Sequence, residues 1–538
     1  MADPVALQPV PPPAAPPRPA WRVVLGLVLA LPALVLLLTS YVEPLIWTVR
    51  SSFQKLSLIR STGGESVGFD NYSAVFDKGL GTGIGRALLF AVVPLLVVLL
   101  LAPLLAWLAH RGGTAGRWAA RGLLALPLAA YAPTAAAAGP MAAAWEDHSG
   151  APSAFAVYWL GGFGLAAALG VTLYLAALRR RTPQHSPLPG LLVAAGIGAL
   201  AVVAVALQAF TAPYVVGEQR DELTPAMQMY QEAFVYAKFG TAAAVSTVLL
   251  LVLMVFGVAA TLLLVLTRTR LEYDDEGPPA GAPRPSAAPV FLAVAGVLAL
   301  IVLAVSWLGL GDWLTRITDG GEPPRDLANV GINTWLPPVV SAAVGVTVAA
   351  LAAVGISGLR PLGRHSEWLL MPFGLFLFVG VTPLAVRAFA AGQTAGRLNS
   401  FVGLIPPSRV AIPALFVLAL LVRGQVLRRE TSVREGRAVP WVRTILPAVP
   451  MLVLAYVVTW FVSAQDLVWG LLTGYGEHSD AQTYLVQAMR EALYRAGGGL
   501  PFRSVLPLWA LVLLVLVAVA AQLAYLDRVA LRAGRRED

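Results

Sequence analysis

The chain has 538 residues and a formal net charge of +9; 58% of its residues are hydrophobic and only 12% are charged. A soluble protein of this length could not bury so much apolar surface, so the composition excludes a soluble domain and indicates an integral membrane protein. The chain has no cysteine, which excludes disulfides and thiolate metal sites, and its five scattered histidines lack metal-binding spacing, so we expect no metal site.

The N-terminal residues 1–20 are rich in Pro and Ala and are predicted to be disordered. The apolar run from Val23 to Ser40 is long for a signal peptide and lacks a small-residue cleavage site, so we interpret it as a retained first span. Apolar stretches of about 20 residues, the length of a membrane-crossing helix, continue along the chain. We therefore expect an all-α polytopic fold with about twelve spans, near 21–42, 86–109, 119–144, 153–178, 189–211, 240–266, 289–309, 335–356, 368–390, 408–425, 442–463 and 504–526.

An acidic and then Pro/Ala/Gly-rich segment, residues 272–289, separates the sixth predicted span from the seventh and is predicted to be a cytoplasmic linker. It divides the chain into two six-helix halves, residues 21–271 and 290–538. Arginine is concentrated in alternate turns and in the C-terminal tail. By the positive-inside rule this predicts a multi-pass protein of the plasma membrane with both termini cytoplasmic, and it explains the basic charge without a nucleic-acid partner.

The two halves share a short sequence pattern before their last spans. TPAMQMYQEAF at 224–234 aligns without a gap with TYLVQAMREAL at 483–493. A spacing of four places the shared polar residues on one face of a helix at the outer lip, and these residues are Thr224, Gln228 and Glu232 in the first half and Thr483, Gln487 and Glu491 in the second. A helix lying in water would explain the polarity but not the same spacing twice, so the pattern predicts an internal duplication. Parallel repeats with a site at their interface are common in transporters.

The chain shows no sign of its own catalytic machinery. None of its three lysines stands in a GK[ST] sequence, so a P-loop ATPase site is excluded, and we expect no catalytic residues and no cofactor on this chain. The predicted spans are almost free of ionisable groups, which argues against a membrane enzyme and a proton-coupled transporter. Asp466, at the outer end of the eleventh span, is the main exception.

Five segments, and the order in which they follow one another along the chain, resemble the permease subunits of ABC importers of the maltose-type carbohydrate class. They are EPLIWTVRSSFQ with GFDNYSAVF, RLNSFVGLIPP at 397–407, RTILPAVPMLVLAYVVTWFVSAQDLVWGLLTG at 443–474, and the two segments of the repeat. The resemblance extends over most of residues 21–271 and 290–535 and implies two fused permease halves. It also implies separate ATPase subunits that bind ATP and Mg²⁺, an extracellular substrate-binding lipoprotein and transport by alternating access.

The resemblance assigns a role to ETSVREG at 430–436. In this family the cytoplasmic turn between the fourth and fifth spans carries an EAA-x-x-D-G motif, a short helix that docks on the ATPase. Glu430, Glu435 and Gly436 match its first Glu, its Asp and its Gly, although Thr and Ser replace the alanines. A solvated loop is the alternative interpretation. The equivalent turn of the first half, residues 178–190, has three prolines and no acidic residue, so we expect the halves to engage ATPases unequally.

The family's translocation path is lined by spans four to six of each half. By resemblance the candidates here are Tyr158, Gln208 and Phe210 in the first half and Trp460, Ser463, Gln465 and Asp466 in the second. Aromatic faces with a few polar groups suit sugar rings. The expected function is therefore the pore of an ATP-driven importer for a sugar or oligosaccharide. The alternatives are a fused permease for ferric iron or thiamine and a permease-derived scaffold or regulator that transports nothing.

Overall fold

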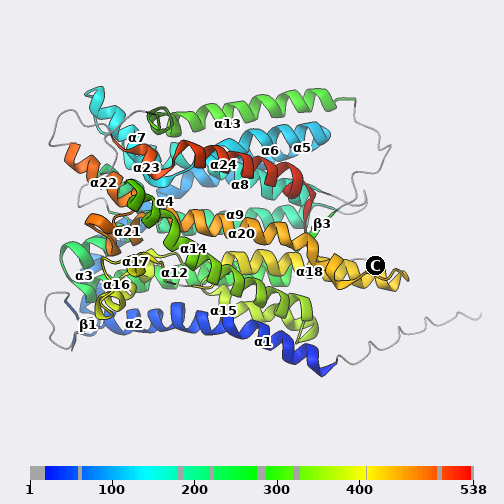
Figure 1. Ribbon diagram of the computed structural model, residues 1–538, viewed down its shortest axis with the longest axis horizontal. Coiled ribbons are helices and arrows are strands. Elements are labelled where there is room, and N and C mark those ends of the chain that lie inside the picture. The colour runs from blue at the N-terminus through cyan, green and yellow to red at the C-terminus, as the bar shows by residue number, and fades with distance from the viewer. Residues whose placement is uncertain are drawn as a thin grey trace, which may run out of the picture.

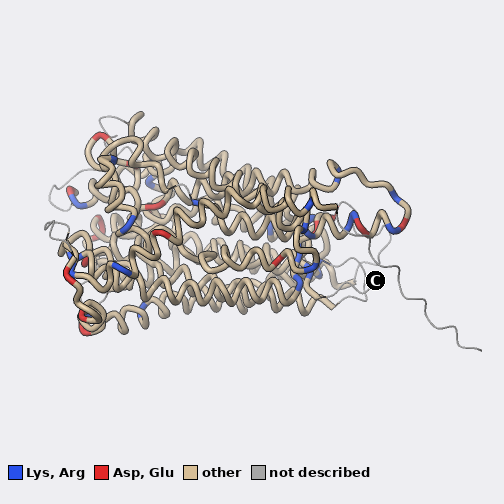
Figure 2. Tube along the Cα trace, turned by 90° about the horizontal axis from the view of Figure 1, so that it is seen from below, with Lys and Arg blue, Asp and Glu red and all other residues tan. Residues whose placement is uncertain are grey.

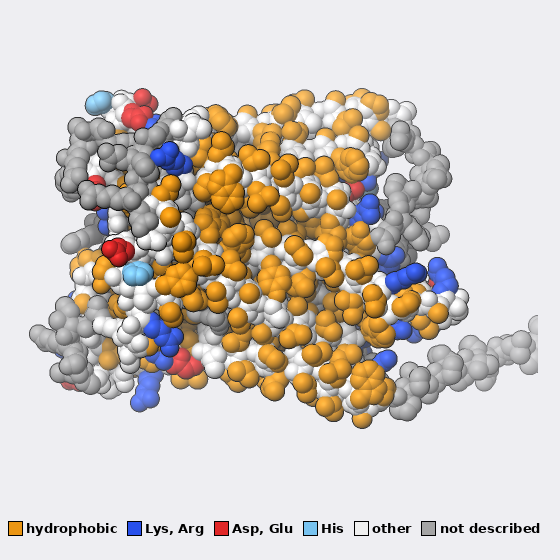
Figure 3. Space-filling model, viewed as in Figure 1, with side chains coloured by type: hydrophobic (Ala, Val, Ile, Leu, Met, Phe, Trp, Pro, Cys, Tyr) orange, Lys and Arg blue, Asp and Glu red, His pale blue; other side chains and the backbone are white. Residues whose placement is uncertain are grey.

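The computed structural model describes residues 19–57, 64–179, 186–217, 223–274, 286–318, 327–407, 409–492 and 500–534. Its helices run roughly side by side along the long axis of the molecule (Figure 1). A broad hydrophobic face covers the middle of the visible surface, with charged side chains near both ends (Figure 3). The predicted disordered N-terminus, apart from Pro19 and Ala20, lies outside the described residues.

In its described residues, the first half contains five long apolar helical runs and the bent pair α6 and α7, joined by short elements. Its helices and strands are α1 (Ala20–Leu37), η1 (Leu38–Val42), α2 (Glu43–Ser52), β1 (Gln54–Lys55), β2 (Glu65–Ser66), α3 (Asp70–Asp77), α4 (Leu80–Leu96), η2 (Val97–Leu101), α5 (Ala102–Arg111), α6 (Gly113–Ala130), α7 (Pro133–Glu146), α8 (Ala154–Leu178), α9 (Leu188–Leu207), α10 (Thr211–Val216), α11 (Pro225–Tyr230), η4 (Gln231–Val235), α12 (Phe239–Leu266) and β3 (Arg270–Tyr273).

The second half is less regular. It contains α13 (Ala288–Arg316), α14 (Leu327–Ala353), η5 (Val354–Leu359), η6 (Gly363–Leu370), α15 (Met371–Gly374), η7 (Thr382–Leu384), α16 (Ala385–Thr394), α17 (Phe401–Leu404), α18 (Ile412–Arg434), α19 (Trp441–Ile445), η8 (Leu446–Ala448), α20 (Val449–Ala464), α21 (Leu467–Thr473), η9 (Gly476–His478), α22 (Ala481–Ala492), α23 (Phe502–Val505), α24 (Leu508–Ala520), η10 (Ala521–Tyr525), η11 (Leu526–Arg528) and β4 (Val529–Arg532).

Among the described residues, nine helical runs are long and apolar enough to cross a membrane, and α6 with α7, bent by 77°, would make a tenth. The protein is thus an all-α membrane protein by the character of its helices. Two of the twelve expected spans are not among these helical runs. The stretch near 368–390 is broken into short helices, since Pro372, Gly374 and Pro383 interrupt it. The stretch near 408–425 is part of the single helix α18, which carries arginines in its last turns.

The two halves pack by exchanging elements. The first helix of the chain, α1, packs against α14 and η5 of the second half, while α13 packs against α5, α6, α7 and α8 of the first half. The last long helices behave in the same way, because α12 contacts α15 and η7, and α24 contacts α6. As a result, the largest hydrophobic core is built from residues of both halves.

Glycines lie where these exchanged helices cross. A Cβ added to Gly355 of η5 would lie 2.5 Å from the carbonyl oxygen of Gly26 in α1, so the two backbones are in direct contact. Gly257 of α12 meets the carbonyl oxygen of Gly374 in the same way, and Gly309 of α13 meets the backbone of Gly161 in α8. Lipid tails are as apolar as side chains, so close backbone approach of this kind supplies much of the attraction between helices in a bilayer.

The last strands of the halves pair with each other at one end of the bundle. β3 and β4 are antiparallel, with Arg270 opposite Arg532 and Tyr273 opposite Val529. Arginines gather at this end, which we call the arginine-rich end and define by β3, β4 and the last turns of α18; they are among the residues coloured blue in Figure 2. Glu272 and Tyr273, expected in the linker, belong to β3; residues 275–285 lie outside the described residues, and α13 begins at Ala288.

One carboxylate joins the halves beside this strand pair. Asp527 of η11 lies 3.0 Å from Nε of Arg117, 3.6 Å from Arg121 and 3.9 Å from Arg179, all of the first half. The Arg121 side chain is only 1% exposed and also donates a hydrogen bond to Gln522 at 2.7 Å. The buried Asp527 carboxylate therefore lies within 4 Å of three guanidinium groups.

We expect Asp527→Asn to lower the free energy of unfolding by about 3 kcal/mol or more, because it leaves buried arginines without a counter-charge. The midpoint of thermal unfolding in detergent, followed by tryptophan fluorescence, measures the change. Asp77→Asn is the control, since Asp77 is exposed at the end of α3 and its loss should leave the midpoint unchanged. Equal midpoints for the two variants would contradict a structural role for Asp527.

Candidate functional site

The fifth long helices of the two halves end in the same way, about 257 residues apart. Helix α9 ends at Leu207 with Gln208 as its C-cap (φ −99°, ψ 10°), and α20 ends at Ala464 with Gln465 as its C-cap (φ −99°, ψ 8°). Each glutamine is followed within three residues by a short helix, α10 or α21. The two glutamines, both translocation-path candidates from the sequence, thus share one backbone conformation at the end of a long helix.

The two glutamine side chains differ in their partners. Gln208 donates to the carbonyl oxygens of Ala204 and Phe378, both at 2.9 Å, and accepts from the N–H of Gly380 at 2.8 Å. It therefore joins α9 to the broken segment of the second half. Gln465 is 4% exposed, yet neither polar atom of its side chain has a hydrogen-bond partner among the described residues.

A cavity of about 170 Å³ lies beside Gln208. Three of the predicted path residues, Tyr158, Gln208 and Phe210, line it together, and Tyr131 completes its aromatic wall. Tyr131 was not singled out from the sequence. It lies in the bend between α6 and α7, and the signal available was Pro133, which begins the new helix two residues later.

The four candidates of the second half are not in the lining of this cavity. Trp460 donates a hydrogen bond from Nε1 to the carbonyl oxygen of Trp335 at 2.8 Å and packs edge-on against the Trp335 ring. Ser463 is half-buried on α20. Asp466 is the N-cap of α21, where its carboxylate accepts from the N–H of Trp469 at 3.1 Å. Asp466 thus has a clear structural role at the start of that helix.

The predicted outer-lip residues of the first half are buried. Thr224 is the N-cap of α11 and donates to the carbonyl oxygen of Ala209 at 2.7 Å. Gln228 donates to the carbonyl oxygen of Val75, and the Glu232 carboxylate, 4% exposed, pairs with Lys78 at 2.6 Å. The polar stripe of this half therefore anchors α11 and η4 to α3 and the residues after it.

The corresponding residues of the second half lie in a different environment. Thr483 is buried, but Gln487 and Glu491 are exposed on α22. The first turn of α22 is capped by Asp480, whose carboxylate accepts from the N–H of Thr483 at 2.8 Å. In their capping role Thr224 and Asp480 therefore correspond. Asp480 was missed, although an aspartate just before a helical run is an ordinary N-cap signal.

The predicted coupling segment is the exposed end of α18. The helix continues through Glu430 to Arg434, and Gly436 has a positive φ of 78°. The N–H of Gly436 bonds to the carbonyl oxygen of Val433, and the N–H of Arg437 bonds to that of Ser432, which is the Schellman pattern of a helix end. Glu430 and Glu435 have side chains 47% and 49% exposed. In Figure 1 this end of α18 extends beyond the neighbouring helices.

A basic recess of about 660 Å³ adjoins this helix end. Arginines outnumber acidic residues in its lining, which includes Arg268, Arg270, Arg360, Arg364, Arg423 and Arg434 with Glu367 and Glu430. Arg423 pairs with Glu367 at 3.1 Å, and Arg360 lies 3.9 Å from Glu430. Of the corresponding turn in the first half, residues 180–185 lie outside the described part of the chain.

No family model, curated protein or solved structure matches this chain in the comparisons.

The contrast between the two glutamines gives a stability prediction. Gln208→Leu should lower the free energy of unfolding by about 1–3 kcal/mol, because the N–H of Gly380 and the carbonyl oxygen of Phe378 lose their partner. Gln465→Leu should leave it unchanged or raise it, because a buried amide without partners is removed. Thermal unfolding of the two variants side by side measures the difference. An equal loss in both would show that Gln465 is also bonded.

Asp480 gives a prediction for pH dependence. Burial raises the pKa of Asp480 to about 6, opposed by hydrogen bonds from Thr483. The folded state thus holds this proton more tightly than the unfolded state, so the stabilisation is present below about pH 4 and is lost as pH rises through 6. As a result, the free energy of unfolding of the wild type should decline by about 3 kcal/mol at most between pH 4.5 and 8. Asp480→Asn keeps the N-cap and should make this decline shallower. Parallel stability–pH curves for the wild type and the variant would contradict it.

Proposed function

We propose that the chain is the pore-forming permease of an ATP-driven importer of the ABC type, with a sugar-class cargo. The observation that carries the proposal is the agreement between the halves at Gln208 and Gln465, where the fifth helix stops with the same backbone conformation and a short helix follows. The exchange of first and last helices between halves supports the same duplicated architecture. A site at the interface of two such repeats is a common transporter arrangement.

The cavity beside Gln208 supports a small cargo with apolar faces and hydroxyl edges. Tyr131, Tyr158 and Phe210 supply aromatic surface, and the Gln208 amide supplies donor and acceptor atoms. Aromatic walls with few polar groups suit a sugar ring. The residues that line the cavity belong to the first half, and Gln208 also bonds to Phe378 and Gly380 of the second half. A rocking motion of the halves would break these two bonds and free the Gln208 side chain in the cavity wall. Alternating access in this form couples the cargo site to the relative position of the halves.

The exposed end of α18 supports docking of an ATPase. Glu430 and Glu435 are accessible, the Schellman turn fixes where the helix stops, and the basic recess beside it offers complementary charge for acidic side chains of a partner. By the positive-inside rule the arginine-rich end, which holds both described ends of the chain, is cytoplasmic in a plasma membrane. ATP and Mg²⁺ would then be bound by the partner ATPase, and an extracellular binding protein would meet the opposite end, near α22.

A permease-derived scaffold that transports nothing is the second candidate. The specific observation in its favour is the size of the cavity at Gln208, since about 170 Å³ is smaller than ordinary ligand pockets of roughly 300–1,000 Å³. A scaffold needs no route for cargo, and the same helix end could still bind a partner. Transport and partner binding must therefore be measured separately.

Purification of the tagged chain with its native partners tests the proposal. We expect an ABC ATPase subunit to co-purify, and Glu430→Ala with Glu435→Ala to reduce both its recovery and the rate of uptake, because the docking charges are lost. The matched control is Glu65→Ala with Asp77→Ala, which removes two exposed carboxylates at the opposite end. Recovery of the ATPase without any uptake activity would favour the scaffold. Absence of an ATPase in every preparation would contradict the proposal.

A further inference from the structure

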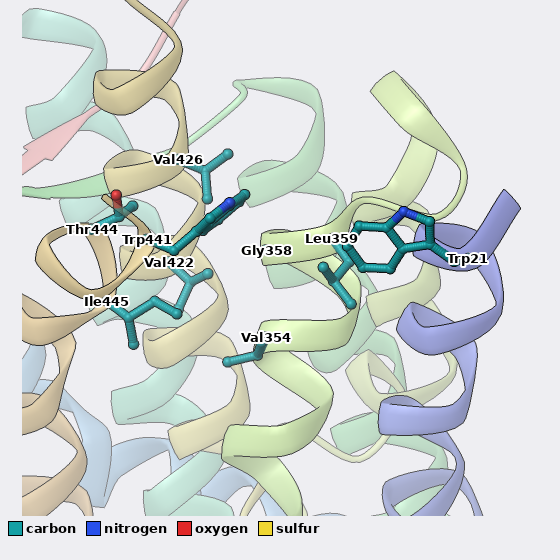
Figure 4. Close-up of a pocket in the computed structure, with 9 residues that line it drawn as sticks. All are labelled: Trp21, Val354, Gly358, Leu359, Val422, Val426, Trp441, Thr444 and Ile445. Atoms are coloured by element: carbon teal, nitrogen blue, oxygen red, sulfur yellow. The ribbon is translucent and has the colours of Figure 1, made fainter. Parts of the chain in front are cut away.

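An apolar cavity of about 220 Å³ lies at the arginine-rich end, between the first helix of the chain and the second half. Its inner wall is formed by the buried Val422 and Val426 of α18, and its mouth by the exposed Trp21 and Ile445. In Figure 4, Trp21 of α1 and Trp441 of α19 lie on either side of η5. The remaining lining residues are Val354, Gly358, Leu359 and Thr444.

Two guanidinium groups lie beside the same indole ring of this cavity. The Arg429 guanidinium carbon is 4.4 Å from the centre of the Trp441 ring, and that of Arg22 is 6.0 Å from it. Arg429 donates to the carbonyl oxygen of Val439 at 2.9 Å, and Nε of Arg22 is buried without a hydrogen-bond partner in the described part of the chain. No carboxylate of the described residues forms a salt bridge with either arginine. The rim of an apolar cavity thus carries two positive charges for which the described part of the chain supplies no salt-bridge partner.

The cavity lies where exposed apolar side chains meet arginines, and this position indicates what kind of molecule would fill it. Trp21 and Ile445 at the mouth are 56% and 38% exposed. Val442 and Leu446, which adjoin the lining residues Trp441 and Ile445 in sequence, are 73% and 61% exposed, so in a membrane these apolar side chains face lipid. Tryptophan is enriched where hydrocarbon meets headgroups, and arginine there attracts lipid phosphates. An apolar slot with cations at its polar end matches a molecule that has a hydrocarbon tail and an anionic head.

We infer that this cavity binds an anionic phospholipid of the leaflet at the arginine-rich end. One acyl chain lies in the slot between Trp21 and Trp441, and the phosphate lies between Arg22 and Arg429. The bound lipid joins α1 of the first half to α18 and α19 of the second, at a place where α1 and η5 are already in backbone contact. The inference does not depend on the ABC assignment.

Lipid binding to the purified, delipidated full chain in detergent tests the inference, with phosphatidylglycerol and phosphatidylcholine of equal chain length as probes. We expect phosphatidylglycerol to bind more tightly and to raise the midpoint of thermal unfolding. Arg22→Gln with Arg429→Gln should weaken its binding by about tenfold or more and leave phosphatidylcholine unaffected, since each basic residue contributes about 1 kcal/mol to attraction of an anionic lipid. Native mass spectrometry gives both affinities.

Two further variants complete the experiment. Arg111→Gln is the matched control, because Arg111 lies over Trp107 at 5.3 Å in the same way but away from the cavity, and its loss should keep the preference for phosphatidylglycerol. Val354→Phe fills the slot without changing charge and should weaken both lipids. Equal binding of the two lipids by the wild type would overturn the inference. So would full binding by the double arginine variant, or protection by glycerol 3-phosphate equal to that by the lipid.

Discussion

Direct contact of backbones at glycine is the constraint on which the assembly of the two halves depends. In water, burial of apolar surface would hold helices together, but in a bilayer the lipid competes for that surface on equal terms. Close backbone packing at glycine pairs therefore contributes much of the attraction between the halves. The pairs are Gly26 with Gly355, Gly257 with Gly374, and Gly309 with Gly161. A Cβ at Gly355, Gly257 or Gly309 would clash with the backbone of the other half and would separate the two helices. The exchange of first and last helices is possible because these crossings have no side chain to accommodate.

Polar contacts between the halves fix the relative position of helices that glycine packing alone does not determine. Asp527 compensates arginines from two helices of the first half, and Gln208 bonds to the backbone of the broken segment between η6 and α16. Both contacts join the halves, one at the arginine-rich end and one beside the cavity. In a low-dielectric interior such groups specify one arrangement, because any alternative leaves a charge or an amide without a partner. The aromatic cavity is positioned by the same bonds that hold the halves in register.

The sequence predicted the class of fold well and its irregularities poorly. Hydropathy located the long helices, because about 20 apolar residues have few alternatives to a membrane helix. It predicted one continuous helix near 368–390, where the structure has several short helices. Pro372, Gly374 and Pro383 break the backbone there, and a hydropathy average does not detect such breaks. The stop of α18 at Gly436 followed from local chemistry and was predictable.

The candidate site was located from the sequence only in part. Tyr158, Gln208 and Phe210 were named by resemblance to the permease family and line one cavity, whereas the candidates near Asp466 lie elsewhere, with Asp466 capping α21. The repeat at 224–234 and 483–493 was visible, but the burial of Glu232 and the exposure of Glu491 depend on what packs against each helix. Lys78, which neutralises Glu232, is 154 residues away in sequence, and no local pattern indicates such a partner.

The pairing of β3 with β4 has a consequence for biosynthesis. A ribosome releases the chain from its N-terminus, and membrane domains generally begin to fold as they emerge. Here α1 must wait for α14 and η5, and β3 must wait for residues 529–532 of β4, which are made long after it. The first half therefore leaves the ribosome with a strand edge and helix faces that are covered only once the second half has been made.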